Sequence, residues 1–427
     1  MTGWLAVLGA AAGVLTAPGY RLFCDLMTGW VLTPGRHTIS RVLTLADTDG
    51  RRAHDAYHRF VRAGRWATAR LWRVLTVHAV ALTCPDGVVE LLVDDTLAHK
   101  SGRTVAGAGS FRDAVRSTSK RVVYAWGLNV VVVCLRVDPP WGGTPIALPL
   151  NLRIRAKKNG KKTTELAAEM VAEIAGWLPD RRFHLTGDGA YACLAGAALP
   201  RTHLTARLRR DAALYQPAPP RTGRRGRPRA RGARLGKPPE LAAAVAANAW
   251  QQAEVDIRSR PATRLVAVFD VLWYEVCKGA LVRLVVVRDP TGNQPDDYFV
   301  TTDLSATGAQ TATRYAGRWP IECCFKDVKQ HAGAEHPQTW QGSGPARAVM
   351  LAFWLYTAVW CCYLAGWSGP TWRVRPWYTR KATPSFLDAL AALRRDLWRQ
   401  RITDMSPGAP LPGEILGPLL DTLAEAA

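Results

Sequence analysis

The sequence is poor in acidic residues. Its 427 residues include 34 Asp and Glu against 56 Lys and Arg, which gives a formal net charge of +22. A GC-rich coding bias accounts for Arg outnumbering Lys by 45 to 11, but it does not account for the shortage of acids. This excess of cations favours a polyanionic partner, because neutralised phosphates release counterions and supply affinity that is independent of sequence. Nucleic acid is the leading partner, and an acidic membrane surface is the second.

Zinc-binding and disulfide patterns are also missing. None of the nine Cys belongs to a C-x2-C pair, and the nine His do not complete a zinc pattern. An odd number of Cys scattered through apolar segments is typical of reduced core thiols in a cytosolic protein. We therefore expect no structural zinc and a cytoplasmic location.

Charge is absent from residues 348–367, a run long enough to span a bilayer. A helix that is hydrophobic all round can instead be the central helix of a large soluble core. The basic flanking loops and the lack of other spans favour burial in protein. Residues 3–19 are apolar as well, but no basic segment precedes them and Pro18 and Gly19 interrupt them, so a signal peptide is not expected.

Two kinds of segment follow one another along the chain. Residues 1–85 are predicted to form helices without a clear helix-turn-helix pattern, so they make either a small DNA-binding domain or a helical packing domain. From Gly87 onward, β-rich runs at 87–96, 121–137 and 144–154 precede a helix at 163–178 and a strand that ends at Asp188. This order predicts an α/β domain with a mixed sheet, which we assign to residues 86–200 and 303–370.

A basic segment interrupts the α/β pattern. Between Arg201 and Lys237 there are twelve Arg or Lys against one Asp, which predicts a flexible loop. Within it, Arg225 and Arg227 belong to an Arg-Gly-Arg-Pro run similar to the core of an AT-hook, which inserts Arg into the DNA minor groove. Strand-like runs at 264–277, 281–288 and 298–302 follow. We therefore expect a basic loop and a β-rich insertion over 201–302, and a helical C-terminal region over 371–427.

A polar motif lies beyond the insertion. Tyr315, Arg318, Glu322 and Lys329 follow the spacing Tyr-x2-Arg-x3-Glu-x6-Lys, which gathers them on one face of a continuous helix. A carboxylate can hold a divalent metal, whereas Arg, Lys and Tyr can hold phosphate oxygens. The alternative is the solvated face of an amphipathic helix. Because Pro320 favours a helix start, we expect a new helix there, with Glu322 in its first turn.

Two upstream positions complete a set of carboxylates. Two-metal cleavage of a phosphodiester needs about three carboxylates that converge from separate elements. Asp94 or Asp95 stands at the end of one predicted strand, Asp188 ends another, and Glu322 follows on a helix. Neighbouring strand residues point to opposite faces, so only one of Asp94 and Asp95 should enter such a site.

The segments VDDT and GDGAY, followed by the Tyr-Arg-Glu-Lys motif, resemble the DDE transposases of bacterial insertion sequences, over roughly residues 87–365. The resemblance implies a ribonuclease H-like catalytic core with a β-rich insertion between the second Asp and the Glu. It also implies metal-dependent cleavage at the transposon ends and attack of the freed 3′-hydroxyl on target DNA. The expected partners are double-stranded DNA with terminal inverted repeats, target DNA and a second copy of the chain, in the bacterial cytoplasm near the nucleoid and not in a membrane.

The resemblance also implies roles for single residues. The catalytic and metal-binding residues would be Asp94 (with Asp95 as the alternative), Asp188 and Glu322, holding two Mg²⁺ or Mn²⁺ ions. Tyr315, Arg318 and Lys329 would hold DNA phosphates beside the cut. Relatives that form a DNA hairpin hold a flipped base on an aromatic residue, for which Trp273 is a candidate and a core position the alternative; for Trp319 we favour a packing role. A second hypothesis is a DNA-binding protein that descends from a transposase and has lost catalysis. A membrane protein is the third.

Overall fold

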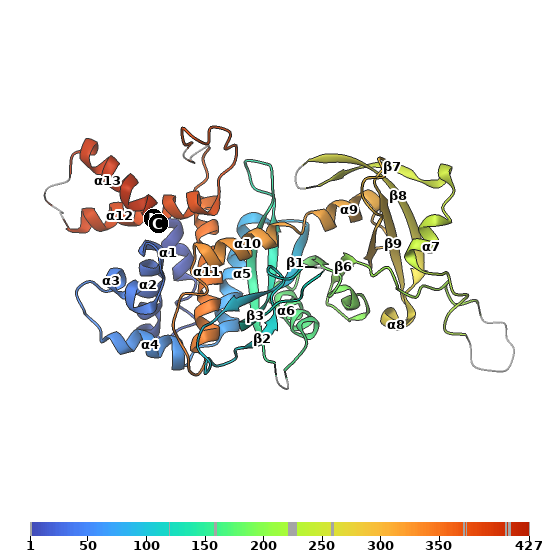
Figure 1. The fold of residues 1–427 in the computed structure, drawn as a ribbon. Helices are drawn as coiled ribbons and strands as arrows, with labels where there is room; N and C mark the ends of the chain where they lie inside the picture. The colour runs from blue at the N-terminus through green and yellow to red at the C-terminus, as the bar shows by residue number, and fades with distance from the viewer. Residues whose placement is uncertain are drawn as a thin grey trace.

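A ten-stranded mixed sheet runs through the molecule (Figure 1). The computed structural model describes residues 2–118, 120–157, 160–220, 229–257, 260–369, 372, 374–405, 408 and 411–426. The strands are β1 (Val88–His99), β2 (Gly109–Arg112), β3 (Tyr124–Val137), β4 (Ile146–Arg155), β5 (Arg182–Gly187), β6 (Thr202–Arg207), β7 (Gln251–Asp256), β8 (Pro261–Leu272), β9 (Leu281–Arg288) and β10 (Asp297–Thr301). Their order is β2-β3-β1-β5-β6-β10-β9-β8-β7, and β4 also pairs with β3.

The first half of this sheet is the core. Strands β4, β3 and β1 are antiparallel neighbours, whereas β5 and β6 run parallel to β1. Helix α6 (Thr163–Trp177) forms the crossover between β4 and β5, as parallel pairing requires. The mixed α/β, ribonuclease H-like fold predicted from the sequence is therefore confirmed.

The second half of the sheet is formed by the residues between β6 and helix α9 (Gly308–Ala316). Strand β10 pairs antiparallel with β6 and joins β9, β8 and β7 to the core sheet. Three short helices lie in its connections, α7 (Pro238–Ala243), η2 (Ala247–Ala249) and α8 (Tyr274–Cys277), and a fourth, η1 (Ala192–Gly196), joins β5 to β6 in the first half.

The prediction of a loop from residue 201 onward is wrong for its first part. Residues 202–207 form β6, where Leu204, Thr205 and Ala206 are buried between β5 and β10. The basic residues that dominate this segment's composition lie around the strand and hide a short buried run. Arg225 and Arg227 lie outside the described residues.

The apolar run at 348–367 forms the central helix of the core. Helix α11 (Gly344–Ala365) is the helix in the described part of the chain that is long and apolar enough to cross a membrane, and 83% of its most apolar window is buried inside the protein. Its neighbours are α5 (Thr68–Thr83) and β4: the Trp354 indole N–H donates to Leu71 O (3.2 Å), and the Thr357 hydroxyl donates to Pro149 O (2.8 Å). Both bonds are to backbone carbonyls of the protein, which agrees with the expected burial in protein.

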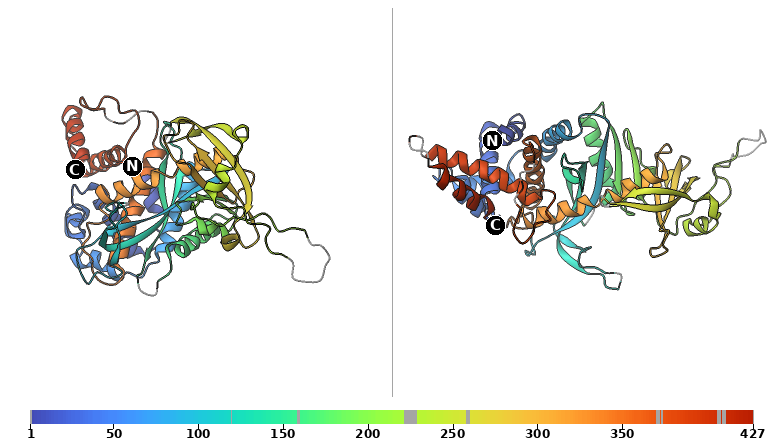
Figure 2. Two further views of the ribbon diagram at one scale, coloured as in Figure 1. Left: turned by 45° about the vertical axis from the view of Figure 1, so that its right-hand side comes forward. Right: turned by 90° about the horizontal axis from the view of Figure 1, so that it is seen from above.

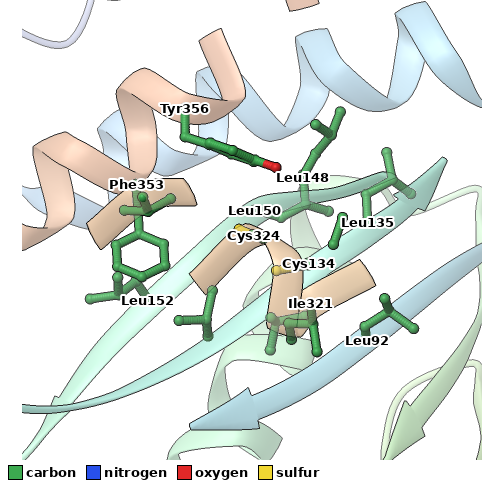
Figure 3. Close-up of a cluster of buried hydrophobic side chains, with 14 of the residues drawn as sticks. Leu92, Cys134, Leu135, Leu148, Leu150, Leu152, Ile321, Cys324, Phe353 and Tyr356 are labelled. Atoms are coloured by element: carbon green, nitrogen blue, oxygen red, sulfur yellow. The ribbon is translucent and has the colours of Figure 1, made fainter. Parts of the chain in front are cut away.

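Helix α10 (Pro320–Gln330) packs its apolar face on the core sheet. Ile321 and Cys324 enter a buried cluster with Leu92 of β1 and Cys134 of β3, covered by Tyr356 of α11 (Figure 3). This packing fixes the rotation of α10, so its polar side chains must face away from the cluster. All nine cysteines are free thiols, but only Cys134, Cys277, Cys324 and Cys361 are buried, and Cys193 and Cys323 are exposed, so the expected core position holds for part of them.

The remaining helices gather at the end of the molecule opposite β7–β9 (Figure 2). They are α1 (Thr2–Gly9), α2 (Ala17–Leu32), α3 (Ile39–Ala46), α4 (His54–Ala63), α12 (Phe386–Met405) and α13 (Gly413–Glu425). The buried guanidinium of Arg394 on α12 donates to Val31 O (2.6 Å) and Thr33 O (3.0 Å) at the end of α2. The two ends of the chain are thus packed against each other.

Candidate active site

Asp94 and Asp188 are brought together by parallel strands. The register of β1 and β5 pairs Val93 with Gly187, so the next residues along, Asp94 and Asp188, are neighbours at the same point of the sheet. The Asp94 carboxyl is largely buried, and its Oδ1 accepts a hydrogen bond from the backbone N–H of Asp95 (2.8 Å).

Asp95 points to the opposite face of β1. Its Oδ2 accepts from the Asn129 amide (2.8 Å) and its Oδ1 from the Tyr191 hydroxyl (3.2 Å). This separation follows from the alternation of side chains along a strand. Asp94 therefore shares a face with α10, whereas Asp95 is held in a hydrogen-bonded network on the other side.

A tight turn after β5 presents Asp188. The Asp188 Oδ1 accepts from the backbone N–H of Ala190 (2.8 Å), and the backbone N–H of Tyr191 donates to Asp188 O (3.1 Å). A Cβ on Gly187 would lie 2.8 Å from Tyr191 Cβ and 3.0 Å from Val93 Cγ1. Glycine is therefore needed at position 187 for the turn to pack this closely on β1.

The polar motif is divided between two helices, as predicted from Pro320. Helix α9 ends at Ala316, a turn carries Arg318, and α10 begins at Pro320 with Glu322 in its first turn. The turn aims Arg318 at the carboxylates. Its Nη1 donates to Asp94 Oδ2 (2.6 Å) and its Nη2 to Glu322 Oε1 (2.8 Å).

This arrangement perturbs the charges at the site. Burial raises the pKa of the Asp94 carboxyl to about 6; the Arg318 guanidinium opposes the rise, and the Asp188 carboxylate adds to it. Burial acts to lower the pKa of Arg318, but the surrounding Asp94, Tyr315 and Glu322 raise it overall. Arg318 is therefore firmly cationic and is the counter-ion that lets these carboxylates stay close.

Tyr315 lies near the Arg318 guanidinium. Its ring packs on Phe299 of β10, with ring centroids 4.4 Å apart. Burial raises the pKa of its hydroxyl, while Arg318 and Arg207 pull the pKa down. The phenol thus stays protonated at neutral pH and is a hydrogen-bond donor next to two arginines.

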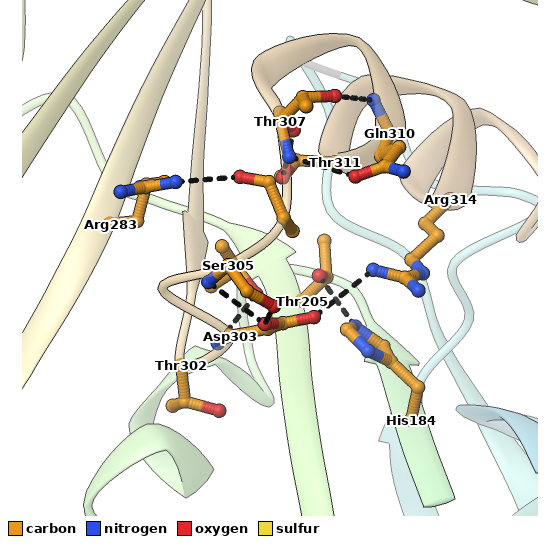
Figure 4. Close-up of polar contacts among 12 residues, drawn as sticks. His184, Thr205, Arg283, Thr302, Asp303, Ser305, Thr307, Gln310, Thr311 and Arg314 are labelled. Carbon is orange, nitrogen blue, oxygen red and sulfur yellow. Dashed lines mark hydrogen bonds and ion pairs between the residues drawn. The ribbon is translucent and has the colours of Figure 1, made fainter. Parts of the chain in front are cut away.

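A second set of ion pairs holds α9 in place (Figure 4). Arg314 of α9 lies 3.3 Å (Nε) from Glu90 Oε1 on β1 and 3.5 Å (Nη1) from Asp303 Oδ2. The hydroxyl of Ser305 donates to Asp303 (2.6 Å), which fixes the loop that leads into α9. Sequence reasoning missed Arg314, because nothing in its spacing distinguishes it from the many other arginines.

Lys329 stands apart from the carboxylates. It lies seven positions after Glu322, or about 10 Å along the helix axis. Burial lowers the pKa of its ammonium group, and the nearby Glu335 and Asp113 raise it. Of the two tryptophans, Trp273 lies between β8 and α8 and packs against the main core, and Trp319 is 37% exposed at the start of α10.

The chemistry of the three carboxylates fits a hard divalent cation, which prefers oxygen ligands. Asp94 and Glu322 already converge on one cationic group, the Arg318 guanidinium. Within the described ranges, no three His, Cys, Asp or Glu side chains stand close enough to hold a metal ion as they are placed. A bound ion would therefore need Arg318 to leave the position between the two carboxylates.

Comparison with known proteins bears on this geometry. The family model described as "DDE superfamily endonuclease" matches residues 20–262, more than half of the chain. The matched segment contains Asp94 and Asp188 and ends before α9 and α10. No curated protein matches the chain. With a ribonuclease H-like sheet that sets these aspartates side by side, the chain belongs to the DDE superfamily of endonucleases.

Proposed function

We propose that the protein is the transposase of an insertion sequence, which cuts DNA at the element's ends and joins them to target DNA. The observations that carry the proposal are that Asp94 and Glu322 both bond to Arg318 and that the pairing of β1 with β5 sets Asp188 beside Asp94. Membership of the DDE endonucleases supports a DNA substrate and a nuclease activity in general.

The protein's own residues would orient the DNA. Released from the carboxylates, Arg318 would bind phosphate oxygens beside the scissile bond, since a guanidinium forms paired hydrogen bonds to phosphate. Tyr315 would donate a hydrogen bond to a phosphate oxygen, and Lys329 would contact the backbone further along. Asp94, Asp188 and Glu322 would hold divalent metal ions, which supply an activated nucleophile and stabilise the leaving oxygen. We propose Mg²⁺, with Mn²⁺ as a substitute.

Paired DNA ends require the chain to act as a homodimer on its terminal inverted repeats. The alternative function, a DNA-binding protein without catalysis, is less well supported because acidic residues occupy all three positions and Glu322 lies in the first turn of α10.

The test is cleavage of DNA that carries the inverted repeats flanking the gene. With Mg²⁺ present, the wild-type protein should nick this DNA, and Glu322→Gln should reduce cutting by about a hundred- to a thousandfold, a loss of the size expected when a group that stabilises transition-state charge is removed. Binding measured by gel shift should be unchanged. Equal cutting by the variant would refute the assignment.

A matched pair of variants tests the first aspartate. Asp94→Asn should lose nearly all cutting. Asp95→Asn should keep more than about a tenth of the wild-type rate, because Asp95 lies on the opposite face of β1. The barrier would then change by less than about 1.4 kcal/mol. The reverse ranking would assign the role to Asp95.

A further inference from the structure

A cavity of about 460 Å³ lies at the far end of α10, away from the carboxylates. From Asp94, strand β1 continues to His99, which lines the cavity, and the segment that follows α10 lines it from Glu335 to Trp340. Its wall contains Trp126 and Trp340, so we call it the tryptophan cavity. Neither tryptophan belongs to the motif or to the set of carboxylates.

The two indoles are exposed and lie against one loop. Trp126 is 39% exposed and Trp340 is 56% exposed, although large aromatic side chains are usually buried. The Trp126 indole N–H donates to Gly102 O (2.9 Å), and Trp340 Nε1 lies 3.8 Å from the position that a Cβ on Gly102 would take. The backbone N–H of Ala106 also donates to Trp340 O (2.8 Å). The Trp126 indole and the Trp340 backbone are therefore both tied to residues 102–106, and the Trp340 indole lies beside Gly102. Tyr124, two residues before Trp126 on β3, adds a third exposed ring on that side.

The charges around the cavity favour an anion. Its lining includes Arg36, Lys100 and Arg116, against the single carboxylate of Glu335. Lys100 Nζ already donates to backbone carbonyls such as Glu335 O (3.2 Å), and Arg116 Nε lies 3.5 Å from Asp113 Oδ2, which leaves Arg36 and the exposed part of Arg116 to meet an anion. Glu335 is already engaged: its Oε1 lies 3.0 Å from His99 Nδ1 and accepts from the His99 backbone N–H (2.9 Å). Aromatic rings beside a free carboxylate could hold an organic cation. Here the carboxylate is taken and the surrounding cations would repel one.

We propose that the tryptophan cavity binds an unpaired nucleobase of a single DNA strand, stacked on Trp340. Flat aromatic side chains inside a basic groove are the usual means of holding single strands, because every base has a face that can stack. The phosphates on either side of the base would lie near Arg36 and Arg116. Lys329, whose pKa the nearby Glu335 and Asp113 raise against the effect of burial, would contact the backbone of this strand between the cavity and the carboxylates.

The inference rests on the proposed function only in taking DNA as the ligand, so binding is measured with no divalent metal present. Fluorescence anisotropy of a labelled oligothymidylate of about a dozen nucleotides should show roughly tenfold weaker binding to Trp340→Ala than to the wild type. Binding of a duplex of equal length should change by less than about twofold, since paired bases are not free to stack. Trp340→Phe keeps an aromatic face and should restore most of the single-strand affinity.

Trp377→Ala is the matched control. This residue is 82% exposed and lies outside the cavity, so its loss should leave both affinities unchanged. Unchanged single-strand binding by Trp340→Ala, equal weakening for single strand and duplex, or an equal effect of Trp377→Ala would overturn the proposal.

A second measurement needs no variant and holds even if Trp340→Ala folds poorly. Irradiation of the wild-type protein with an oligonucleotide containing 5-iodouracil should attach the base to Trp340 or Trp126, identified by mass spectrometry of the peptides. Adducts confined to other residues would contradict the proposal. The two ideas fail separately: cutting by Glu322→Gln sinks the catalytic assignment, whereas these binding results concern the cavity alone.

Discussion

At the scale of single residues, the site is governed by one arginine. Arg318 bonds to Asp94 and to Glu322, so the metal-binding carboxylates of our proposal are neutralised in this structure by a side chain of the same motif. The three residues come from a strand, a turn and a helix. The spacing of the motif predicted that Arg318 and Glu322 would be close, and the resemblance implied that Asp94 would join them. It could not predict that Arg318 would bridge two acids, because that depends on the angle between α9 and α10.

The raised pKa of Asp94 leads to a prediction about stability. Its ordinary value is 3.8 and its folded value is about 6, so between these pH values the folded protein binds more protons at this group than the unfolded chain does. The free energy of unfolding must then fall as the pH rises through this window, by up to about 3 kcal/mol.

Urea unfolding of the metal-free protein from pH 4 to pH 7 measures this effect. The Asp94→Asn variant carries no titrating group at this position and should show a correspondingly shallower fall. Burial also raises the pKa of Asp327 to about 6, but Asp327 is present in both proteins and cancels in the comparison. Parallel curves for the two proteins would contradict the prediction.

At the scale of elements, α10 is placed by its apolar face. Ile321 and Cys324 are fully buried against the sheet, while Glu322, between them in sequence, faces Arg318. The position of Glu322, the glutamate of our proposal, thus depends on packing as much as on its own bonds.

Replacing Ile321 by Ala should therefore lower the free energy of unfolding by about 2–4 kcal/mol, because it leaves a cavity under the first turn of α10. Cutting should fall together with stability, since Glu322 would lose its fixed position. Cys323→Ala, on the exposed side of the same turn, is the control and should change stability by less than about 0.5 kcal/mol. Equal stability of the two variants in urea unfolding would show that α10 is held in another way.

The elements also show where sequence reasoning succeeds and fails. The helix start at Pro320 was predictable. Proline has no backbone N–H to donate inside a helix, but the first helical position makes no such bond, and the fixed φ of proline suits it. Strand β6 was not predictable, because Leu204, Thr205 and Ala206 form too short an apolar run among arginines. The segment forms a strand because it pairs with β5 on one side and with β10 on the other.

At the scale of the whole molecule, the charge of +22 favours DNA binding and the fold determines which surfaces meet the DNA. The mixed sheet could be predicted because the order of strands and helices along the chain restricts how they can pair. The tryptophan cavity could not be predicted, since its two indoles are more than two hundred residues apart in sequence.

The charge predicts a steep dependence of DNA binding on salt. A protein that neutralises six to ten phosphates loses about 10³- to 10⁵-fold in affinity between 50 and 200 mM salt, because counterions must return to the DNA. We expect a loss in this range for duplex DNA, measured by anisotropy at several salt concentrations. A change smaller than about tenfold would mean that most of the cations do not face the DNA.

The hydrogen-bonded ladder from β6 through β10 to β7 has one further consequence. A domain joined by a flexible linker can drift, but strands of a shared sheet keep a set distance from one another. If DNA contacted both β7–β9 and the carboxylates, the shared sheet would fix the distance between the two contacts. The cut would then fall at a fixed distance along the DNA from the segment that β7–β9 bind.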